Sequence, residues 1–299
     1  MKKIISALLA FILIIGAASS AFAMSDGDYR VVFGADLTEA EREEVLGIFG
    51  LSGEELDENR VLTVTNAEER AYLNGKVPDN QIGTRSISSI YIKALPEGSG
   101  VTVSAHNINY CTADMYKSVL ATVGITDAEI IVAAPRSVSG TAALTGIYKA
   151  YESLTGALIS DYAKMAGVEE LITTGKLAEL IGSEQATEVI TELKKILDIT
   201  RTMSDDDVRA KIAEIAEQYN VELTEEHIRQ ILTLVRMLEG LDVEQIRARA
   251  LGLVNAATGW QKFTEGVSQV FTDIAGFFKD VANFLRGIFD GLFTPNTAG

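Results

Sequence analysis

The sequence predicts an α+β protein, in which an N-terminal mixed sheet with short helices is followed by an all-helical C-terminal region. Three observations support this class. Short runs rich in β-branched and aromatic residues alternate with short helical runs over the first 135 residues. The prolines are Pro78, Pro96, Pro135 and Pro295, so no proline interrupts a helix between residues 136 and 294. In a chain of 299 residues, an apolar content of 47% is enough for a packed core.

Five segments have the composition of strands, because Val, Ile, Thr and aromatic residues dominate them. They are Tyr29–Phe33, Arg60–Thr65, Ser86–Ala94, Val101–Ile108 and Glu129–Ala133. The intervening segment Leu95–Gly100 holds a proline, two glycines and a serine, which favours a turn. We therefore expect the third and fourth strands to form a hairpin. The pattern does not predict the order of the strands in the sheet.

Helix starts are predicted from residues that commonly cap helices, some of them followed by an acidic residue three positions later. These starts are Thr38 with Glu41, Asn66 with Glu69, Thr112, Ser204 with Asp207, and Thr224. Within segment 133–152, a strand is predicted to end at Pro135, and a helix rich in small residues is predicted to begin near Ser139. From there onward, apolar residues recur at helical spacing.

The first 23 residues have the features of a cleaved signal peptide. Lys2 and Lys3 precede an apolar run, Ile4–Ala18, and Ala21-Phe-Ala gives a cleavage pattern after Ala23. The chain is therefore predicted to be exported and to act in the extracytoplasmic envelope. The predicted domains are the signal peptide (1–23), an α+β domain (24–138), a helical region (139–256) and an amphipathic, Phe-rich C-terminal helix (257–299).

Charge and residue types exclude several functions. Acidic residues outnumber basic ones by 42 to 26, which gives a formal charge of −16, and loss of Lys2 and Lys3 would make the chain more negative. Such a chain lacks the basic surface that nucleic acid requires. With one cysteine and two histidines, it has no internal disulfide framework and no Cys₄ or Cys₂His₂ zinc site. We predict no metal and no cofactor.

The C-terminal segment concentrates the aromatic residues, since most of the 11 phenylalanines lie between residues 263 and 293. Apolar residues recur there at spacings of three and four. The stripe comprises Trp260, Phe263, Val267, Val270, Phe271, Ile274, Phe277, Phe278, Val281, Phe284, Leu285, Ile288 and Phe289. It fits a helix that folds back on its own domain, that binds a protein partner or a second copy, or that lies on a membrane surface.

Two further sets of residues are candidates for chemistry. Cys111 precedes a predicted helix start, where the helix N-terminus could activate a thiol, and His106 lies on the preceding strand. A lone cysteine is more often a buried apolar residue than a catalyst. Near the helix start at Ser139, a phosphate or other small ligand could bind through Arg136, Ser139, Gly140 and Thr141.

The segment 133–152, together with Arg85-Ser-Ile-Ser-Ser upstream and Met115-Tyr116 between them, resembles the YpuA-like family, domain of unknown function 1002. The resemblance covers residues 29–255 and is most specific over residues 85–152. It implies an exported bacterial protein without assigned activity and without known catalytic residues. It also implies an apolar residue, such as valine, at the position of Cys111, which weakens a thiol mechanism.

These observations leave three hypotheses for function. The first is a non-enzymatic envelope protein that binds a partner, itself or a membrane through residues 260–293. The second is an extracytoplasmic hydrolase or transferase that uses carboxylates or Cys111 with His106. The third is a small-ligand binder at the helix start near Ser139.

Overall fold

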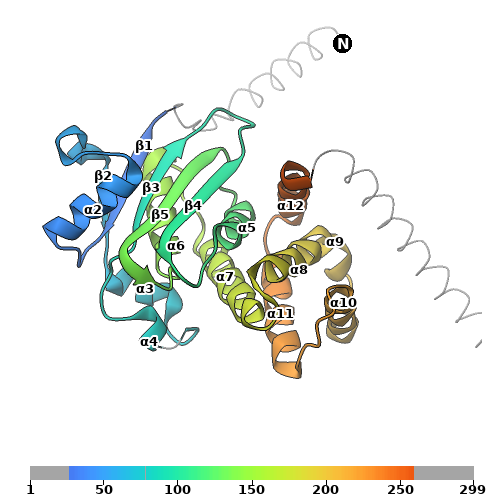
Figure 1. The fold of residues 1–299 in the computed structure, drawn as a ribbon. Coiled ribbons are helices and arrows are strands. Elements are labelled where there is room, and N and C mark those ends of the chain that lie inside the picture. Colours follow the sequence, from blue (N-terminus) through green and yellow to red (C-terminus); the bar gives the residue numbers. More distant parts are fainter. Residues whose placement is uncertain (1–26, 78, 259–299) are drawn as a thin grey trace, which may run out of the picture. The chain divides into compact units, whose positions relative to one another are not determined.

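The computed structural model describes residues 27–77 and 79–258, and it confirms the α+β class (Figure 1). The strands are β1 (Tyr29–Gly34), β2 (Val61–Val64), β3 (Ser89–Ala94), β4 (Val101–Ile108) and β5 (Ala128–Val138). The helices of the first half are α2 (Glu39–Phe49), α3 (Asn66–Leu73), α4 (Asp79–Ile82), α5 (Ala113–Val123) and the 3₁₀ turns η1 (Gly53–Glu55) and η2 (Glu58–Arg60). The later helices are α6 (Ala143–Thr155), α7 (Asp161–Ile181), α8 (Ser183–Lys195), α9 (Leu197–Thr200), α10 (Asp205–Gln218), α11 (Glu225–Leu238) and α12 (Val243–Thr258). Contacts divide the chain into two units, Met1–Ala250 and Leu251–Gly299, and the structure describes residues 251–258 of the second.

The described strands form one mixed sheet in the order β2-β1-β3-β5-β4. The expected hairpin of β3 and β4 is wrong, because β5 lies between them, antiparallel to β3 and parallel to β4. Leu95–Gly100 still reverses the chain, but a turn does not decide which strand becomes the neighbour. The uninterrupted apolar run of β5 takes a central place, and β4, with polar Thr102, Ser104 and His106 on alternate positions, takes the edge.

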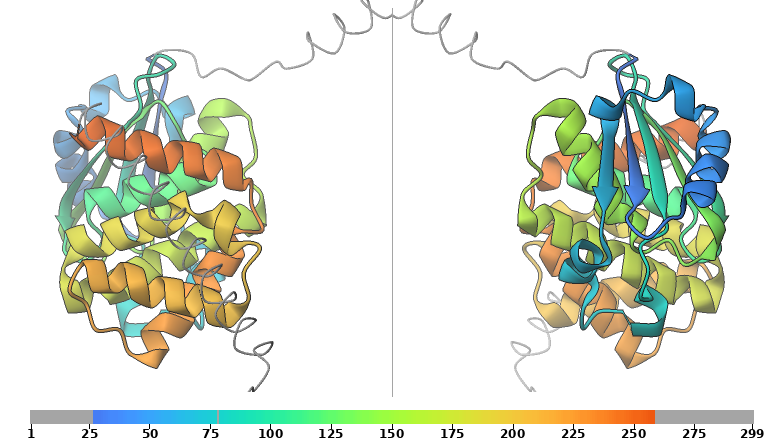
Figure 2. Two further views of the ribbon diagram at one scale, coloured as in Figure 1. Left: turned by 90° about the vertical axis from the view of Figure 1, so that its right-hand side faces the viewer. Right: turned by 90° about the vertical axis from the view of Figure 1, so that its left-hand side faces the viewer.

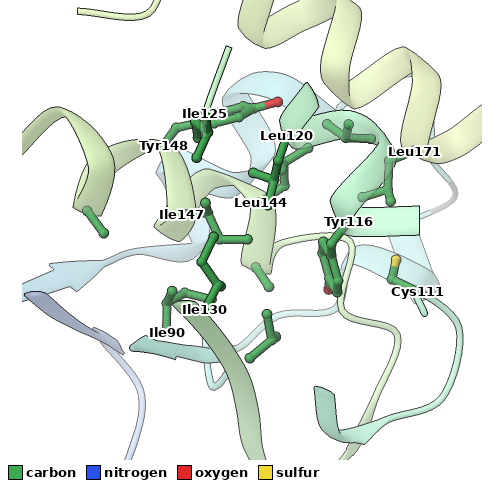
Figure 3. Close-up of a cluster of buried hydrophobic side chains, with 14 of the residues drawn as sticks. Ile90, Cys111, Tyr116, Leu120, Ile125, Ile130, Leu144, Ile147, Tyr148 and Leu171 are labelled. Carbon is green, nitrogen blue, oxygen red and sulfur yellow. The ribbon is translucent and has the colours of Figure 1, made fainter. Parts of the chain in front are cut away.

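Two faces of the sheet bury alternate side chains, as the two-residue period of a strand requires. On one face Val32, Ile90 and Ile130 pack with α5, α6 and the first part of α7, where Leu144 and Ile147 are among the fully buried residues (Figure 3). On the other face Val31 and Phe33 pack against α2. The helices that follow β5 therefore share the core of the sheet.

β5 continues through Pro135 to Val138, and α6 begins at Ala143, so the expected strand end and helix start are both displaced. Pro135 lies beyond the ladder with β3, which ends at the pair Ser89 and Ala133. On its other side, a bulge at Asn107, with φ of 60°, interrupts the ladder with β4. A proline is tolerated at such a bulge because no ladder hydrogen bond needs its missing N–H.

The start of α3 differs from the prediction by one residue. Thr65 caps the helix and forms the capping box with Glu68, whose carboxylate accepts the Thr65 N–H at 2.8 Å. The sequence predicts this box on Asn66 and Glu69 instead, but in the structure those two side chains hydrogen-bond to each other. The other predicted caps, at Thr38, Thr112, Ser204 and Thr224, are confirmed.

A second core joins the later helices, from the middle of α7 to the first part of α12 (Figure 2). Between α5, α7 and α8 lies a buried ion pair of Lys194 and Glu170, whose side chains are 1% and 0% exposed. Among residues 27–77 and 79–258, no helix is both long enough and apolar enough to cross a bilayer. The predicted boundaries at residues 23, 138 and 256 stay predictions.

Candidate functional site

A polar cleft of about 500 Å³ opens where the segment before β3 meets the segment after β5. It is lined by Glu69, Ile82, Gly83, Thr84, Arg85, Ile87, Ser88, Asn109, Arg136, Ser137, Val138, Ser139, Gly140 and Ala142. β3 and β5 run antiparallel, so the residues just before β3 and the last residues of β5 meet at one end of the sheet. The sheet topology, rather than any local turn, therefore builds this cleft.

Two arginines, Arg85 and Arg136, line the cleft and form ion pairs with the same carboxylate, that of Glu41. Arg136 contacts Glu41 at 2.6 Å and Arg85 contacts it at 3.3 Å, while both guanidinium side chains remain almost half exposed. The Thr38 backbone N–H and then Arg136 lower the pKa of Glu41 to about 2, so Glu41 stays ionised. Because each guanidinium has five N–H donors, Glu41 orients both groups without using up their capacity to bind an anion.

Glu69 is the buried acid of the cleft, with 1% of its surface exposed. Its Oε1 lies 2.6 Å from the Ser86 hydroxyl, and its Oε2 accepts a long bond of 3.3 Å from the Asn66 amide. Burial raises the pKa of Glu69 to about 7. The cleft therefore contains an acid that changes charge near neutral pH.

The turn from β5 into α6 depends on Gly140. Its φ of 87° lies in the left-handed region, and a Cβ there would lie 2.5 Å from both Ile108 Cγ2 and Tyr116 Oη. The Tyr116 hydroxyl donates to the Gly140 carbonyl at 2.6 Å and holds the turn in place. Among the described residues, no side chain caps the N-terminus of α6, where Ala142 is the cap residue and lines the cleft.

The structure brings together three of the four predicted ligand-binding residues. Arg136, Ser139 and Gly140 line the cleft, whereas Thr141 is buried and lines a separate cavity of about 160 Å³ with Tyr110 and Ile172. The Thr141 hydroxyl still lies 3.3 Å from that of Ser139. The candidate site is therefore larger than predicted, and it extends from the start of α6 to Arg136, Arg85 and Glu69.

Cys111 and His106 are not brought together. His106 is exposed on β4 and pairs with Ala133, whose side chain belongs to the α2 face of the sheet. Cys111 is buried beside Tyr116 in the core on the opposite face (Figure 3). Burial raises the pKa of the Cys111 thiol to about 12, against the lowering expected at a helix start. The geometry therefore gives no support to a thiol mechanism.

We predict that Cys111 in the folded chain reacts with a thiol reagent at pH 8 more than about a hundredfold more slowly than after unfolding. The reason is twofold, since the thiol is buried and carries little thiolate at that pH. Labelling with an aromatic disulfide reagent, with and without guanidinium chloride, measures both rates. Equal rates in the two states would show that Cys111 is accessible and activated.

Sequence reasoning missed Glu69, Glu41 and Asn109 as site residues, and it used Arg85 only for the family resemblance. One signal could have found Arg85: the four-residue pattern Arg85-Ser-Ile-Ser recurs as Arg136-Ser-Val-Ser. Both copies lie at the cleft: the first provides Arg85 and Ser88, and the second provides Arg136, Ser137 and Ser139. For Glu69 there was no such signal, because its spacing from Asn66 is that of a helix cap.

Among residues 27–77 and 79–258, no group of three or more His, Cys, Asp or Glu side chains is arranged to hold a metal ion. The predicted leader over 1–23 and the apolar stripe from Trp260 to Phe289 lie outside the described residues. Their roles in export and in binding remain predictions from the sequence.

The comparison with known proteins identifies the family. Residues 33–250 match the family model described as a protein of unknown function, DUF1002, and the chain belongs to this family. It is also 34% identical over 268 residues to the Uncharacterized protein YpuA of Bacillus subtilis (strain 168), which covers 88% of this chain and 90% of that protein. No solved structure matches the chain. The family match extends over both arginines, Glu69 and all the other residues of the cleft.

Proposed function

We propose that this protein binds a small, hydroxylated oxyanion, such as a uronic acid or a phosphate ester, in the cleft between Arg85 and Arg136. The observation that carries the proposal is a pair of arginines that line the cleft, come from segments 51 positions apart and converge with their guanidinium groups on Glu41. The two share the carboxylate of Glu41, and each guanidinium keeps N–H groups that can donate to a second anion. Charge-assisted hydrogen bonds from such donors favour an anionic ligand.

The remaining lining supports a ligand that also carries hydroxyl groups. Serine and threonine hydroxyls and the Asn109 amide can each donate or accept a hydrogen bond. Ile82, Ile87 and Val138 add a small apolar surface against which a sugar ring can pack. A cleft of about 500 Å³ has a volume within the usual range for small-molecule sites. The leader predicted over residues 1–23 supports a place of action outside the cytoplasm.

Thermal unfolding of the purified chain tests the proposal with three probes: glucuronate, inorganic phosphate and glucose. We expect glucuronate or phosphate to raise the melting temperature and glucose, which has no charge, to leave it unchanged. A shift with glucuronate alone indicates a sugar acid, and a shift with phosphate alone indicates a phosphate ester. Saturation at about 100 times Kd would add about 2.7 kcal/mol to the stability.

The variant R136Q should weaken the binding of the active probe by about ten- to a hundredfold, because a charge-assisted hydrogen bond contributes about 1.5–3 kcal/mol. R229Q is the matched control, since it removes the same charge from an exposed pair with Glu226 on α11. Isothermal titration calorimetry measures both affinities. If R136Q binds as the unmodified chain does, or if no anion stabilises the chain, the proposal is wrong.

A further inference from the structure

We propose that the cleft takes up its anion together with one proton, which Glu69 carries. This inference rests on the binding function proposed above and adds a second, much smaller ligand to the same site. It follows from the hydrogen bonds around Ser86, which connect the acid of the cleft to the backbone of the sheet.

The Ser86 hydroxyl lies 2.6 Å from Glu69 Oε1 and 2.8 Å from the carbonyl oxygen of Val64. A hydroxyl has one proton to donate, and the Val64 carbonyl can only accept. If Glu69 were ionised, the single Ser86 hydroxyl proton would have two acceptors, the Glu69 carboxylate and the Val64 carbonyl. One of these two short oxygen–oxygen contacts would then have no hydrogen between its atoms. If Glu69 is a neutral acid, it donates to Ser86 and Ser86 donates to Val64. The neutral acid alone satisfies both contacts.

The charged groups around Glu69 agree with this arrangement. Apart from burial, the carboxylates of Asp36, after β1, and of Glu68, on α3, raise the pKa of Glu69, while Ser86 and Asn66 oppose them. The cations that face this region are already paired. Arg70 of α3 pairs with Asp79, Lys149 of α6 pairs with Glu68, and Arg85 and Arg136 share Glu41. No cation of the described neighbourhood is hydrogen-bonded to the Glu69 carboxyl.

An anion in the cleft would lie near this buried carboxyl. An ionised Glu69 would repel it across a poorly solvated space, whereas a neutral Glu69 would not. The anion therefore selects the protonated form. With a pKa of about 7, the protonated fraction falls about tenfold between pH 6 and pH 8, and the apparent affinity falls with the fraction that is competent to bind.

Isothermal titration calorimetry with glucuronate at pH 6, 7 and 8 tests the inference, because this carboxylate is fully ionised over the whole range. If thermal unfolding identifies phosphate as the active probe, sulfate replaces glucuronate, since it too stays ionised. We expect the affinity of the unmodified chain to fall about tenfold from pH 6 to pH 8. Titration in two buffers of different ionisation enthalpy should show the uptake of nearly one proton per anion at pH 8.

The variant E69Q should bind at pH 8 as tightly as the unmodified chain does at pH 6, without pH dependence, because glutamine is neutral and similar in shape. E184Q, which removes an exposed carboxylate on α8, is the control and should follow the unmodified chain.

The two proposals fail differently. Binding that is equally tight at pH 6 and pH 8, without proton uptake, would overturn the role of Glu69 and leave the anion site standing. Retention of the full pH dependence by E69Q would overturn the role of Glu69 in the same way. Absence of binding at every pH, by both glucuronate and sulfate, would overturn the proposed function and this inference with it.

Discussion

Replacement of Lys194 by methionine is expected to lower the free energy of unfolding by about 3–5 kcal/mol, the largest effect that we predict for a single substitution. The Lys194 ammonium is 1% exposed, contacts the Glu170 carboxylate and donates to the Ser118 carbonyl at 2.7 Å. Methionine keeps most of the volume but removes the charge. Glu170 would then be a buried carboxylate whose remaining hydrogen bonds come from the Ser118 and Thr122 hydroxyls.

Burial lowers the pKa of Lys194, and the neighbouring Glu170 opposes that effect. Pairing of the two charges therefore compensates for the desolvation cost, whereas either charge buried alone would destabilise the fold. The double variant E170Q/K194M removes both charges and keeps a side chain that can hydrogen-bond to Ser118 and Thr122. It should recover all but about 1–2 kcal/mol of the loss, because replacing both partners leaves no unpaired charge.

Urea denaturation of the three variants measures these differences. K195M is the control at the next position, since Lys195 pairs with Glu192 near the surface and its loss should cost less than about 1 kcal/mol. A K194M chain as stable as K195M would mean that the buried pair does not hold α5, α7 and α8 together. A double variant as unstable as K194M would show that packing, rather than charge, is what matters.

The second large effect is a pH-dependent change at Glu69. At pH 8 the variant E69Q should be more stable than the unmodified chain by about 3 kcal/mol, and at pH 4 the two should be equal within about 1 kcal/mol. The folded pKa of about 7 exceeds the ordinary value of 4.5, so the folded state binds the proton more tightly than the unfolded state. The contribution of this proton to stability is complete below pH 4.5. It is lost as the pH rises through 7.

Glutamine removes that dependence because it cannot ionise, and its amide can donate to the Ser86 hydroxyl as the neutral acid does. Urea denaturation of both chains at pH 4, 5, 6, 7 and 8 gives the difference in unfolding free energy directly. The measurement requires no ligand, so it tests the protonation of Glu69 independently of anion binding. Equal stability of the two chains at pH 8 would contradict a raised pKa of Glu69 in the folded chain.

Much of the local structure could be predicted from the sequence, because local chemistry determines it. All five strands lie where β-branched residues predicted them, and Gly124 ends α5 with φ of 87°. Strand order depends on which strand is buried on both faces, and composition at the turn does not report this. The offset at α3 has a similar cause, since Thr65 with Glu68 and Asn66 with Glu69 are equally good capping pairs by spacing.

The site was predictable only in part. Arg136, Ser139 and Gly140 follow one another along the chain, so a single distinctive segment could indicate all three. Arg85 reaches the same cleft through the antiparallel pairing of β3 and β5, and Glu69 reaches it from α3 through the Ser86 hydroxyl. These pairs of residues, Glu69 with Ser86 and Arg85 with Arg136, are 17 and 51 positions apart along the chain. A sequence pattern does not specify them until the sheet is known.

The location of bound anion is the most direct test of the central claim. Amide chemical shifts of the isotope-labelled chain, recorded by NMR during a titration with glucuronate or phosphate at pH 6, report which segments bind. We expect the largest changes in segments 84–88 and 136–142. A second cavity of similar size, about 520 Å³, lies beside α2, and its lining includes four glutamates and one arginine, Arg42. It provides an internal control. Changes centred on that cavity, or spread evenly over the chain, would contradict an anion site between Arg85 and Arg136.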